Sequence, residues 1–126
     1  MYHIVTSIEM GRELKASHDI KAGTIVTRCE ILVLSQEDTL TLNNLTDLKC
    51  YTFTFDSNRD CLVLGDGELF NHSSEPNVGY TLTQYENRSV MVFVSVRDIK
   101  AGEQLFIDYS ADVSEIDIDK YTVNLI

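Results

Sequence analysis

The sequence has few basic residues, and this shortage argues against one class of function. Ten Lys and Arg stand against twenty Asp and Glu, which gives a formal net charge of −10. A nucleic-acid surface needs clustered Lys and Arg to contact phosphates, so we expect no direct binding to nucleic acid. The acidic excess fits either a solvated surface or a basic partner that is attracted at long range.

Cysteines and long hydrophobic runs are also scarce. The three cysteines are an odd number and form no CxxC motif, so we expect neither a zinc ribbon nor a disulfide framework. No run approaches the roughly 20 apolar residues of a membrane-spanning helix. The N-terminal residues MYHIVTSIEMGRELK include acids and lack the apolar segment of a signal peptide. We expect a soluble intracellular protein, cytoplasmic or nuclear, without bound metal or membrane contact.

β-branched and aromatic residues, by contrast, recur along the chain at a period of two, which is typical of strands. A single segment, 35–50, suits a helix, because it opens with Ser35 as a candidate N-cap. Its leucines Leu40, Leu45 and Leu48 fall near one helix face. With 44% hydrophobic residues in 126, the chain can bury one core, so we predict a mainly-β single domain with one short helix. The strand-like runs cover residues 24–34, 51–55, 61–65, 78–85, 90–96 and 104–109.

Two short stretches stand out between these runs. FNHSSEPN, residues 70–77, contains the only proline of the chain, and the pentapeptide DIKAG occurs twice, at 19–23 and 98–102. Two copies are too few for a repeat protein. We interpret them as two similar turns, in which glycine supplies the positive φ that a tight turn often needs.

In chain order the pieces are FNHSSEPN, the second DIKAG followed by Glu103, and QLFIDY ending at Tyr109. This order resembles the SET domain of protein lysine methyltransferases, with its NHSxxPN loop, its turn ending in Gly-Glu and its strand ending in Asp-Tyr. GRELKASHDIKAGTIV is similar to the family's N-terminal strand pair. The resemblance covers about residues 5–112 of a single domain spanning 1–126 and leaves 113–126 as a tail. In length the chain is close to minimal viral-type SET proteins without pre-SET or post-SET modules.

The resemblance implies a fold and a reaction. The fold would be a β-clip of short twisted sheets with a C-terminal pseudoknot, in which the last segment threads the FNHSSEPN loop. The reaction would move a methyl group from S-adenosyl-L-methionine to a lysine of a basic protein or peptide, such as a histone, and leave S-adenosyl-L-homocysteine. No metal would take part. Two copies would also be able to pair as a homodimer through exposed strands.

The resemblance also assigns roles to residues. We expect Tyr109 and Tyr51 to be catalytic, and Tyr51, Ile107 and Tyr109 to line the lysine channel. The Asn71 amide would bind the methionyl end of the cofactor, while His72 would hold the loop. Ser73 and Asn77 would fix the turn. The full set of expected cofactor-binding residues is Gly11, Arg12, Glu13, Phe70, Asn71, His72 and Tyr109.

The sequence departs from the family pattern near both ends. Glu13 replaces the second glycine of Gly-x-Gly, and Lys15 stands where an apolar residue is usual. Glu13 either weakens cofactor binding or faces the ammonium group of the cofactor. The tail has no cysteine cluster, and Val113 replaces an expected aromatic, with Tyr121 the nearest candidate. The tail acids either contact a basic peptide or belong to a solvated terminus.

Two other interpretations remain open. One is a SET-fold binding or interaction module without catalysis, which Glu13 and the tail favour. The other is a structural β-clip, such as a capsid or sugar-binding module. Such a module would have no use for Asn71 and Tyr109 together. Binding of S-adenosyl-L-methionine separates the enzyme from both.

Overall fold

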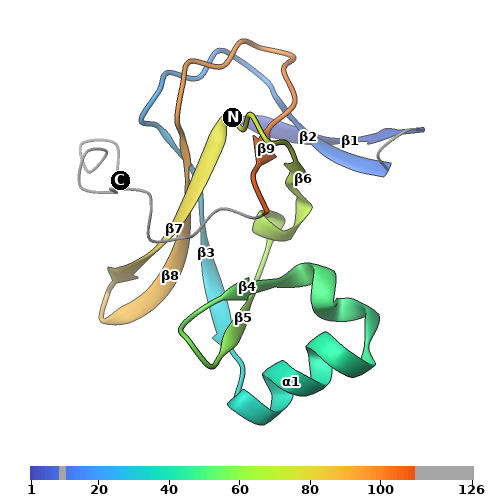
Figure 1. The fold of residues 1–126 in the computed structure, drawn as a ribbon. Helices are drawn as coiled ribbons and strands as arrows, with labels where there is room; N and C mark the ends of the chain where they lie inside the picture. The colour runs from blue at the N-terminus through green and yellow to red at the C-terminus, as the bar shows by residue number, and fades with distance from the viewer. Residues whose placement is uncertain (9–10, 110–126) are drawn as a thin grey trace.

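The computed structural model describes residues 1–8 and 11–109 of the chain, and most of its regular structure is strand (Figure 1). This confirms the prediction of a mainly-β fold with one α-helix. The predicted tail, residues 113–126 with Val113 and Tyr121, lies outside the described residues. No described helix is long and apolar enough to cross a membrane. The elements are β1 (Tyr2–Ser7), β2 (Gly11–Ala16), β3 (Ile25–Val33), α1 (Gln36–Leu45), the 3-10 helix η1 (Asp47–Tyr51), β4 (Thr52–Thr54), β5 (Asp60–Val63), the 3-10 helix η2 (Asp66–Leu69), β6 (Asn71–His72), β7 (Val78–Tyr85), β8 (Arg88–Ser95) and β9 (Phe106–Ile107).

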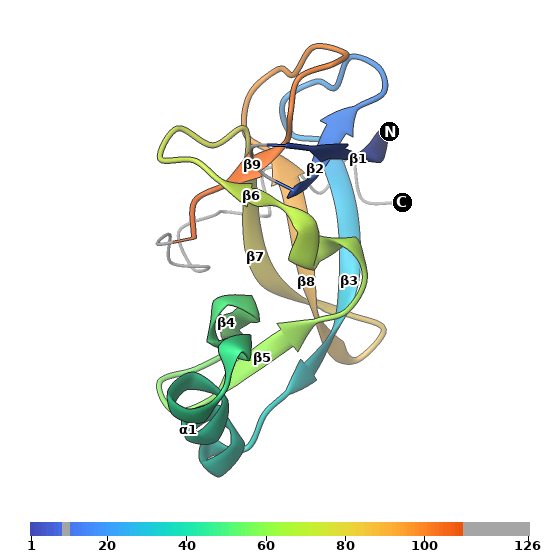
Figure 2. The same ribbon diagram turned by 90° about the vertical axis from the view of Figure 1, so that its right-hand side faces the viewer.

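The strands form three sheets. The largest is antiparallel, in the order β4-β5-β3-β8-β7, while β1 pairs with β2 and β6 pairs in parallel with β9. Strand β3 is long enough to pair with β8 along its first part and with β5 along its last three residues. Figures 1 and 2 show the result: α1, β4 and β5 lie at one end of the molecule, and the β1–β2 hairpin with β6 and β9 lies at the other.

Strand β8 contributes to two apolar clusters because its side chains alternate between the faces of the sheet. Met91 and Phe93 point into the main core, where the Phe93 ring stacks on Phe70 with the centroids 4.7 Å apart. Val90, Val92 and Val94 form a second cluster, and all three are fully buried. Strand β8 is therefore buried on both faces, which explains its continuous run of apolar residues.

The two DIKAG turns pack against each other. Their isoleucines, Ile20 and Ile99, exchange main-chain hydrogen bonds of 2.8 and 2.7 Å. The aspartate of each turn accepts the main-chain N–H of the alanine in the other, Ala22 and Ala101, at 2.9 Å in both cases. Their glycines have φ of 83° and 89°, the left-handed region that favours glycine. Both copies are turns with glycine at positive φ, as predicted, and their mutual hydrogen bonds make the repeated pentapeptide one reciprocal structure.

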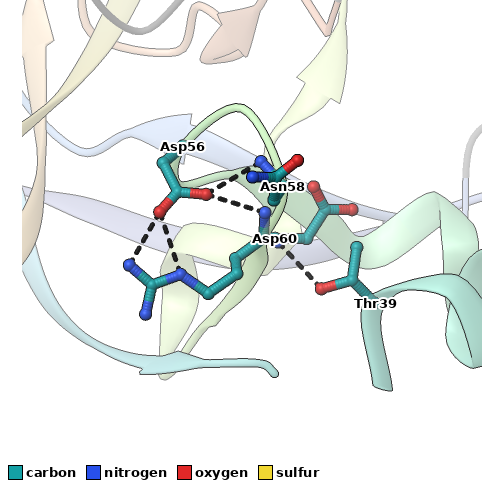
Figure 3. Close-up of polar contacts among 5 residues, drawn as sticks. Thr39, Asp56, Asn58 and Asp60 are labelled. Carbon is teal, nitrogen blue, oxygen red and sulfur yellow. Dashed lines mark hydrogen bonds and ion pairs between the residues drawn. The ribbon is translucent and has the colours of Figure 1, made fainter. Parts of the chain in front are cut away.

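Helix α1 docks on the sheet through polar side chains. Ser35 caps its N-terminus as expected, because its hydroxyl accepts the Asp38 N–H at 3.0 Å. The buried residue of the helix is Thr39, whose hydroxyl accepts the Asp60 N–H at 3.0 Å (Figure 3). Leu40 and Leu45, by contrast, are 57% and 79% exposed. The predicted leucine face does not pack against the sheet.

The turn between β4 and β5 completes this end of the molecule. The Asp56 carboxylate accepts the main-chain N–H groups of Asn58 and Arg59 and two hydrogen bonds from the Arg59 guanidinium (Figure 3). These bonds lower the pKa of Asp56 below its ordinary value. We call residues 35–63 the helical lobe.

Candidate active site

The FNHSSEPN loop and the segment after the second DIKAG turn lie side by side. The parallel pair of β6 and β9 places Asn71 opposite Phe106 and His72 opposite Ile107. The Ser73 N–H donates to the carbonyl of Ile107 at 2.9 Å, which extends this pairing by one residue. The arrangement agrees with the expected approach of the C-terminal segment to this loop. We call residues 70–77 and 104–109 together the clasp.

Asn77 fixes the clasp from inside. It is 1% exposed, and its amide donates to the carbonyl of Gln104 and accepts the N–H of Phe106, both at 2.8 Å. Ser73 does shape the local turn, because its hydroxyl accepts the Glu75 N–H at 3.0 Å. Asn77, which we expected to fix the turn, instead fixes a segment that is distant in the sequence.

Tyr109 lies at the end of the clasp and is held at both its main chain and its phenol. Its hydroxyl donates to the carbonyl of Phe70 at 2.6 Å, and its N–H donates to Nδ1 of His72 at 3.0 Å. The rings of His72 and Tyr109 are tilted against each other with centroids 5.1 Å apart. Because 57% of Tyr109 is exposed, a fixed phenol stands at the surface of the site.

The hydrogen bond from Tyr109 also shows which role Nδ1 of His72 takes. Nδ1 accepts a hydrogen bond from the Tyr109 N–H, so this nitrogen offers its lone pair in the contact. The Asp108 carboxylate is 3.8 Å from the same nitrogen, and an ion pair there would require a proton on Nδ1. The 3.0 Å hydrogen bond is the shorter contact, and it makes Nδ1 the acceptor for Tyr109. His72 thus positions Tyr109, in line with its expected role of holding the loop.

Asn71 connects the clasp to strand β2. Its amide nitrogen donates to the main-chain carbonyl of Arg12 at 3.0 Å and to Oε1 of Gln104 at 2.8 Å. Both amide hydrogens are therefore used, while the amide oxygen accepts no hydrogen bond from the described residues. The oxygen is the atom of this side chain that can accept from a ligand.

The Gly11–Arg12–Glu13 stretch opens β2 beside Asn71. Gly11 has φ of 74°, which a residue with a Cβ adopts at a cost. Glu13 is 6% exposed, and its carboxylate is 3.6 Å from Nζ of Lys15. The structure therefore brings together Arg12, Asn71, His72, Tyr109 and the carbonyl of Phe70, and places Glu13 on the adjoining strand.

Two of the expected site residues point their side chains into the core, and a third, Tyr51, lies in the helical lobe. The side chains of Phe70 and Ile107 belong to the main core, with 2% and 1% exposed, so Phe70 presents its carbonyl to the site and not its ring. Tyr51 ends η1 in the helical lobe and is 45% exposed. Their roles at a cofactor or lysine channel stay predictions.

Sequence reasoning missed Gln104. Its side chain accepts a hydrogen bond from Asn71 in the other part of the clasp, and its main chain pairs with Lys15 of β2 in an isolated β-bridge. Sequence reasoning also missed Glu68, whose carboxylate accepts the Val63 N–H at 2.9 Å just before the clasp. Burial raises the pKa of Glu68 to about 7. Gln104 opens the run QLFIDY next to another polar residue, Glu103, so its position gave no sequence signal, and Glu68 gave none either.

Comparisons with known proteins agree with this geometry. The model of the SET domain family matches residues 11–110. The chain is 32% identical over 100 residues to a histone-lysine N-methyltransferase, H3 lysine-37 specific, of Schizosaccharomyces pombe. It is 44% identical over 48 residues to a potential protein lysine methyltransferase, SET6, of Saccharomyces cerevisiae. These alignments cover 79% and 38% of the chain, but only 66% and 12% of the two relatives.

Solved structures show the same fold. A candidate histone methyltransferase of Plasmodium falciparum superposes with a TM-score of 0.72 at 22% identity, covering 89% of this chain and 99% of the other. A chain of an apo ctPRC2 structure with mutations in Ezh2 gives 0.73 at 22% identity, covering 97% of this chain and 16% of that one. The predicted fold class is confirmed.

Proposed function

The chain belongs to the SET domain family, and from this premise we propose that it is an S-adenosyl-L-methionine-dependent protein lysine N-methyltransferase. Its substrate would be a basic protein tail such as that of a histone, in line with the names of its relatives. The observation that carries the proposal is the hydrogen bond from the Tyr109 hydroxyl to the Phe70 carbonyl, which fixes an exposed phenol beside Asn71 and His72. The net charge of −10 favours a basic substrate.

The residues next to the clasp fit the amino-acid end of such a cofactor. The Asn71 amide oxygen and the Glu13 carboxylate accept no hydrogen bond from the described residues, and both are acceptors that an ammonium group needs. When bound, S-adenosyl-L-methionine would supply a methyl group activated by a sulfonium. Arg12 and His72 would hold Asn71 and Tyr109 in place through the bonds described above.

Tyr109 would orient the substrate amine. Its hydroxyl hydrogen is donated to Phe70, so its oxygen acts as an acceptor toward the reacting groups. The lysine must arrive neutral, although its free pKa is about 10.4, and burial in an apolar channel lowers that pKa. The rate would come from alignment and exclusion of water, without a strong base in the protein. We place Tyr51 and Ile107 along the channel, and Ile107 leaves more room than an aromatic would.

A second candidate is a SET-fold binding module without catalysis. The buried carboxylate of Glu13 favours it, because a side chain there occupies space that glycine leaves open in the family pattern. The two candidates differ in whether the cofactor binds at all.

The first experiment is calorimetric titration of the full chain with S-adenosyl-L-homocysteine, wild type beside Asn71→Ala. We expect micromolar binding that Asn71→Ala weakens by about tenfold or more, since the variant removes the acceptor oxygen and the bonds to Arg12 and Gln104. Absence of binding at millimolar ligand would reject the methyltransferase in favour of the binding module.

Tyr109→Phe tests catalysis separately from binding. The variant keeps the ring against His72 but loses the bond to Phe70. We expect methyl transfer to histone peptides, followed by mass spectrometry, to slow by about a hundredfold. The affinity for S-adenosyl-L-homocysteine should change less than about threefold. Equal rates of the variant and the wild type would remove Tyr109 from the reaction.

A further inference from the structure

The two positions at which β2 departs from the family pattern, Glu13 and Lys15, form an ion pair with each other. We propose that this pair is the receptor for the amino-acid end of the cofactor, with the Glu13 carboxylate binding its ammonium group and Lys15 its carboxylate. The inference rests on the proposed function and names two residues that would determine how tightly the cofactor binds.

Glu13 has little exposed surface, but its carboxylate is not sealed from solvent, and it has a cationic neighbour in Lys15. Its side chain is 8% exposed, and its nearest cation, Nζ of Lys15, is 3.6 Å away. Among the residues that the structure describes, no N–H or O–H group donates a hydrogen bond to it. A carboxylate that the protein leaves without a donor can accept hydrogen bonds from a ligand, and an ammonium group brings three N–H donors. Glu13 is thus prepared for a cationic ligand.

The strand geometry directs this pair toward the clasp. Glu13 and Lys15 are two residues apart in β2, so their side chains point to the same face. Lys15 is opposite Gln104 in an antiparallel bridge, which puts the side chain of Gln104 on that face too. Gln104 in turn accepts a hydrogen bond from Asn71 at 2.8 Å. The ion pair and the Asn71 amide therefore border one polar surface.

The charges of this surface match those of an amino-acid group. A zwitterion carries one ammonium and one carboxylate, and the pair offers one charge of each sign. The charged side chain of Lys15 is 39% exposed, so it can turn toward a carboxylate while Glu13 takes the ammonium. A glycine at position 13 would offer only main-chain groups. The competing interpretation is that Lys15 merely neutralises Glu13 and that neither residue contacts the cofactor.

Two ligands separate these interpretations. S-adenosyl-L-homocysteine contains the amino-acid group, whereas 5′-methylthioadenosine keeps the adenosine and the thioether but lacks that group. Calorimetry with the full chain would measure both ligands on the wild type, Glu13→Gln and Lys15→Gln. We expect Glu13→Gln to weaken S-adenosyl-L-homocysteine by about tenfold or more and Lys15→Gln by about threefold. The affinity for 5′-methylthioadenosine should change less than about twofold in both.

Glu30→Gln is the matched control. It makes the same chemical change in β3, where Glu30 forms an ion pair with Arg88 of β8, and it should leave the affinity for both ligands unchanged. A melting temperature for each variant shows that it is folded. If Glu13→Gln weakens both ligands equally, or neither, the receptor role is wrong even though the cofactor binds. If the wild type binds neither ligand, the proposed function is wrong as well.

Discussion

Two asparagines connect separate segments of this protein, and they do so in regions that are built differently. Asn77 joins the two parts of the clasp through main-chain groups of Gln104 and Phe106, and it is fully enclosed. Asn43 in the helical lobe also uses both ends of its amide, but it donates to the Asp60 carboxylate and accepts from the Thr52 hydroxyl in a partly exposed position. The same residue type thus holds a buried backbone in one region and solvent-accessible side chains in the other.

This difference indicates which of the two regions tolerates amino-acid substitutions. The main-chain partners of Asn77 are present whatever the neighbouring side chains are, so in its interior the clasp depends on this one side chain and on exact backbone positions. The lobe depends on three polar side chains, Thr39, Asn43 and Asp60, and water can replace a bond that is lost there. We expect the clasp to tolerate fewer substitutions than the lobe.

The largest effect is expected when this comparison is tested with the same substitution at both positions. Asn77→Ala leaves the Phe106 N–H and the Gln104 carbonyl buried without partners, so we expect the free energy of unfolding to fall by about 3 kcal/mol. Asn43→Ala should cost about 1 kcal/mol because its partners can bind water. Urea unfolding of both variants measures the difference.

Ligand binding by Asn77→Ala and Asn43→Ala provides a second measurement. Asn77→Ala should abolish binding of S-adenosyl-L-homocysteine, and Asn43→Ala should retain it. Equal losses of stability in the two variants would mean that the clasp is no more dependent on its asparagine than the lobe.

Gly67 lies in η2, between the helical lobe and the clasp, and a substitution there tests how tightly the segment between them is packed. A Cβ at this position would lie 2.6 Å from Cγ1 of Val63 and 2.7 Å from Cε2 of Phe93. Both neighbours are buried, and the Phe93 ring is stacked on Phe70, so they cannot move freely. We expect Gly67→Ala to lower the free energy of unfolding by about 2 kcal/mol, measured by thermal and urea unfolding. An unchanged stability would show that Val63 and Phe93 repack without cost.

Much of the clasp could be predicted from sequence because its signals are local. Proline, asparagine and serine in FNHSSEPN predict a turn, and Ser35 predicts a helix start, whatever the rest of the chain does. The partners of these residues could not be predicted. Asn77 bonds to residues almost thirty positions away, and the DIKAG copies bond to each other. Such pairs are decided by how the chain packs as a whole, and no short pattern of residues encodes them.

The lobe was predicted less well for a related reason. The spacing of Leu40, Leu45 and Leu48 favours a buried helix face, yet the helix is fixed through Thr39 and Asn43. A hydroxyl that accepts a distant main-chain N–H, or an amide that donates to a distant carboxylate, leaves no periodic signal in the sequence. Glu13 and Lys15 show the same limit, since each alone reads as a departure from the family pattern and only the structure pairs them.

Glu68 makes the stability of the protein depend on pH. Burial raises the pKa of its carboxyl from 4.5 to about 7, so the folded protein favours the protonated form. The stability that this group contributes is complete below about pH 4.5 and is lost as the pH rises through 7. We expect Glu68→Gln, which keeps an acceptor for the Val63 N–H, to be more stable than the wild type at pH 8 by about 1 kcal/mol, because solvent screens the half-buried carboxylate.

Urea unfolding at pH 4 and pH 8 measures this difference, and Glu75→Gln on the loop surface serves as the control. At pH 4 the two proteins should agree within about 0.5 kcal/mol. If the difference in free energy of unfolding between the wild type and Glu68→Gln is the same at both pH values, the carboxylate is solvated.

The smallest effect is expected at the leucines of the lobe. Leu45 is 79% exposed, so Leu45→Ala removes little buried surface and should change the free energy of unfolding by less than about 0.5 kcal/mol. The affinity for S-adenosyl-L-homocysteine should stay the same, because the clasp does not depend on this side chain. A loss above about 1 kcal/mol would instead mean that Leu45 is covered in solution. A melting temperature that rises with protein concentration in the wild type but not in Leu45→Ala would identify a second copy as the cover.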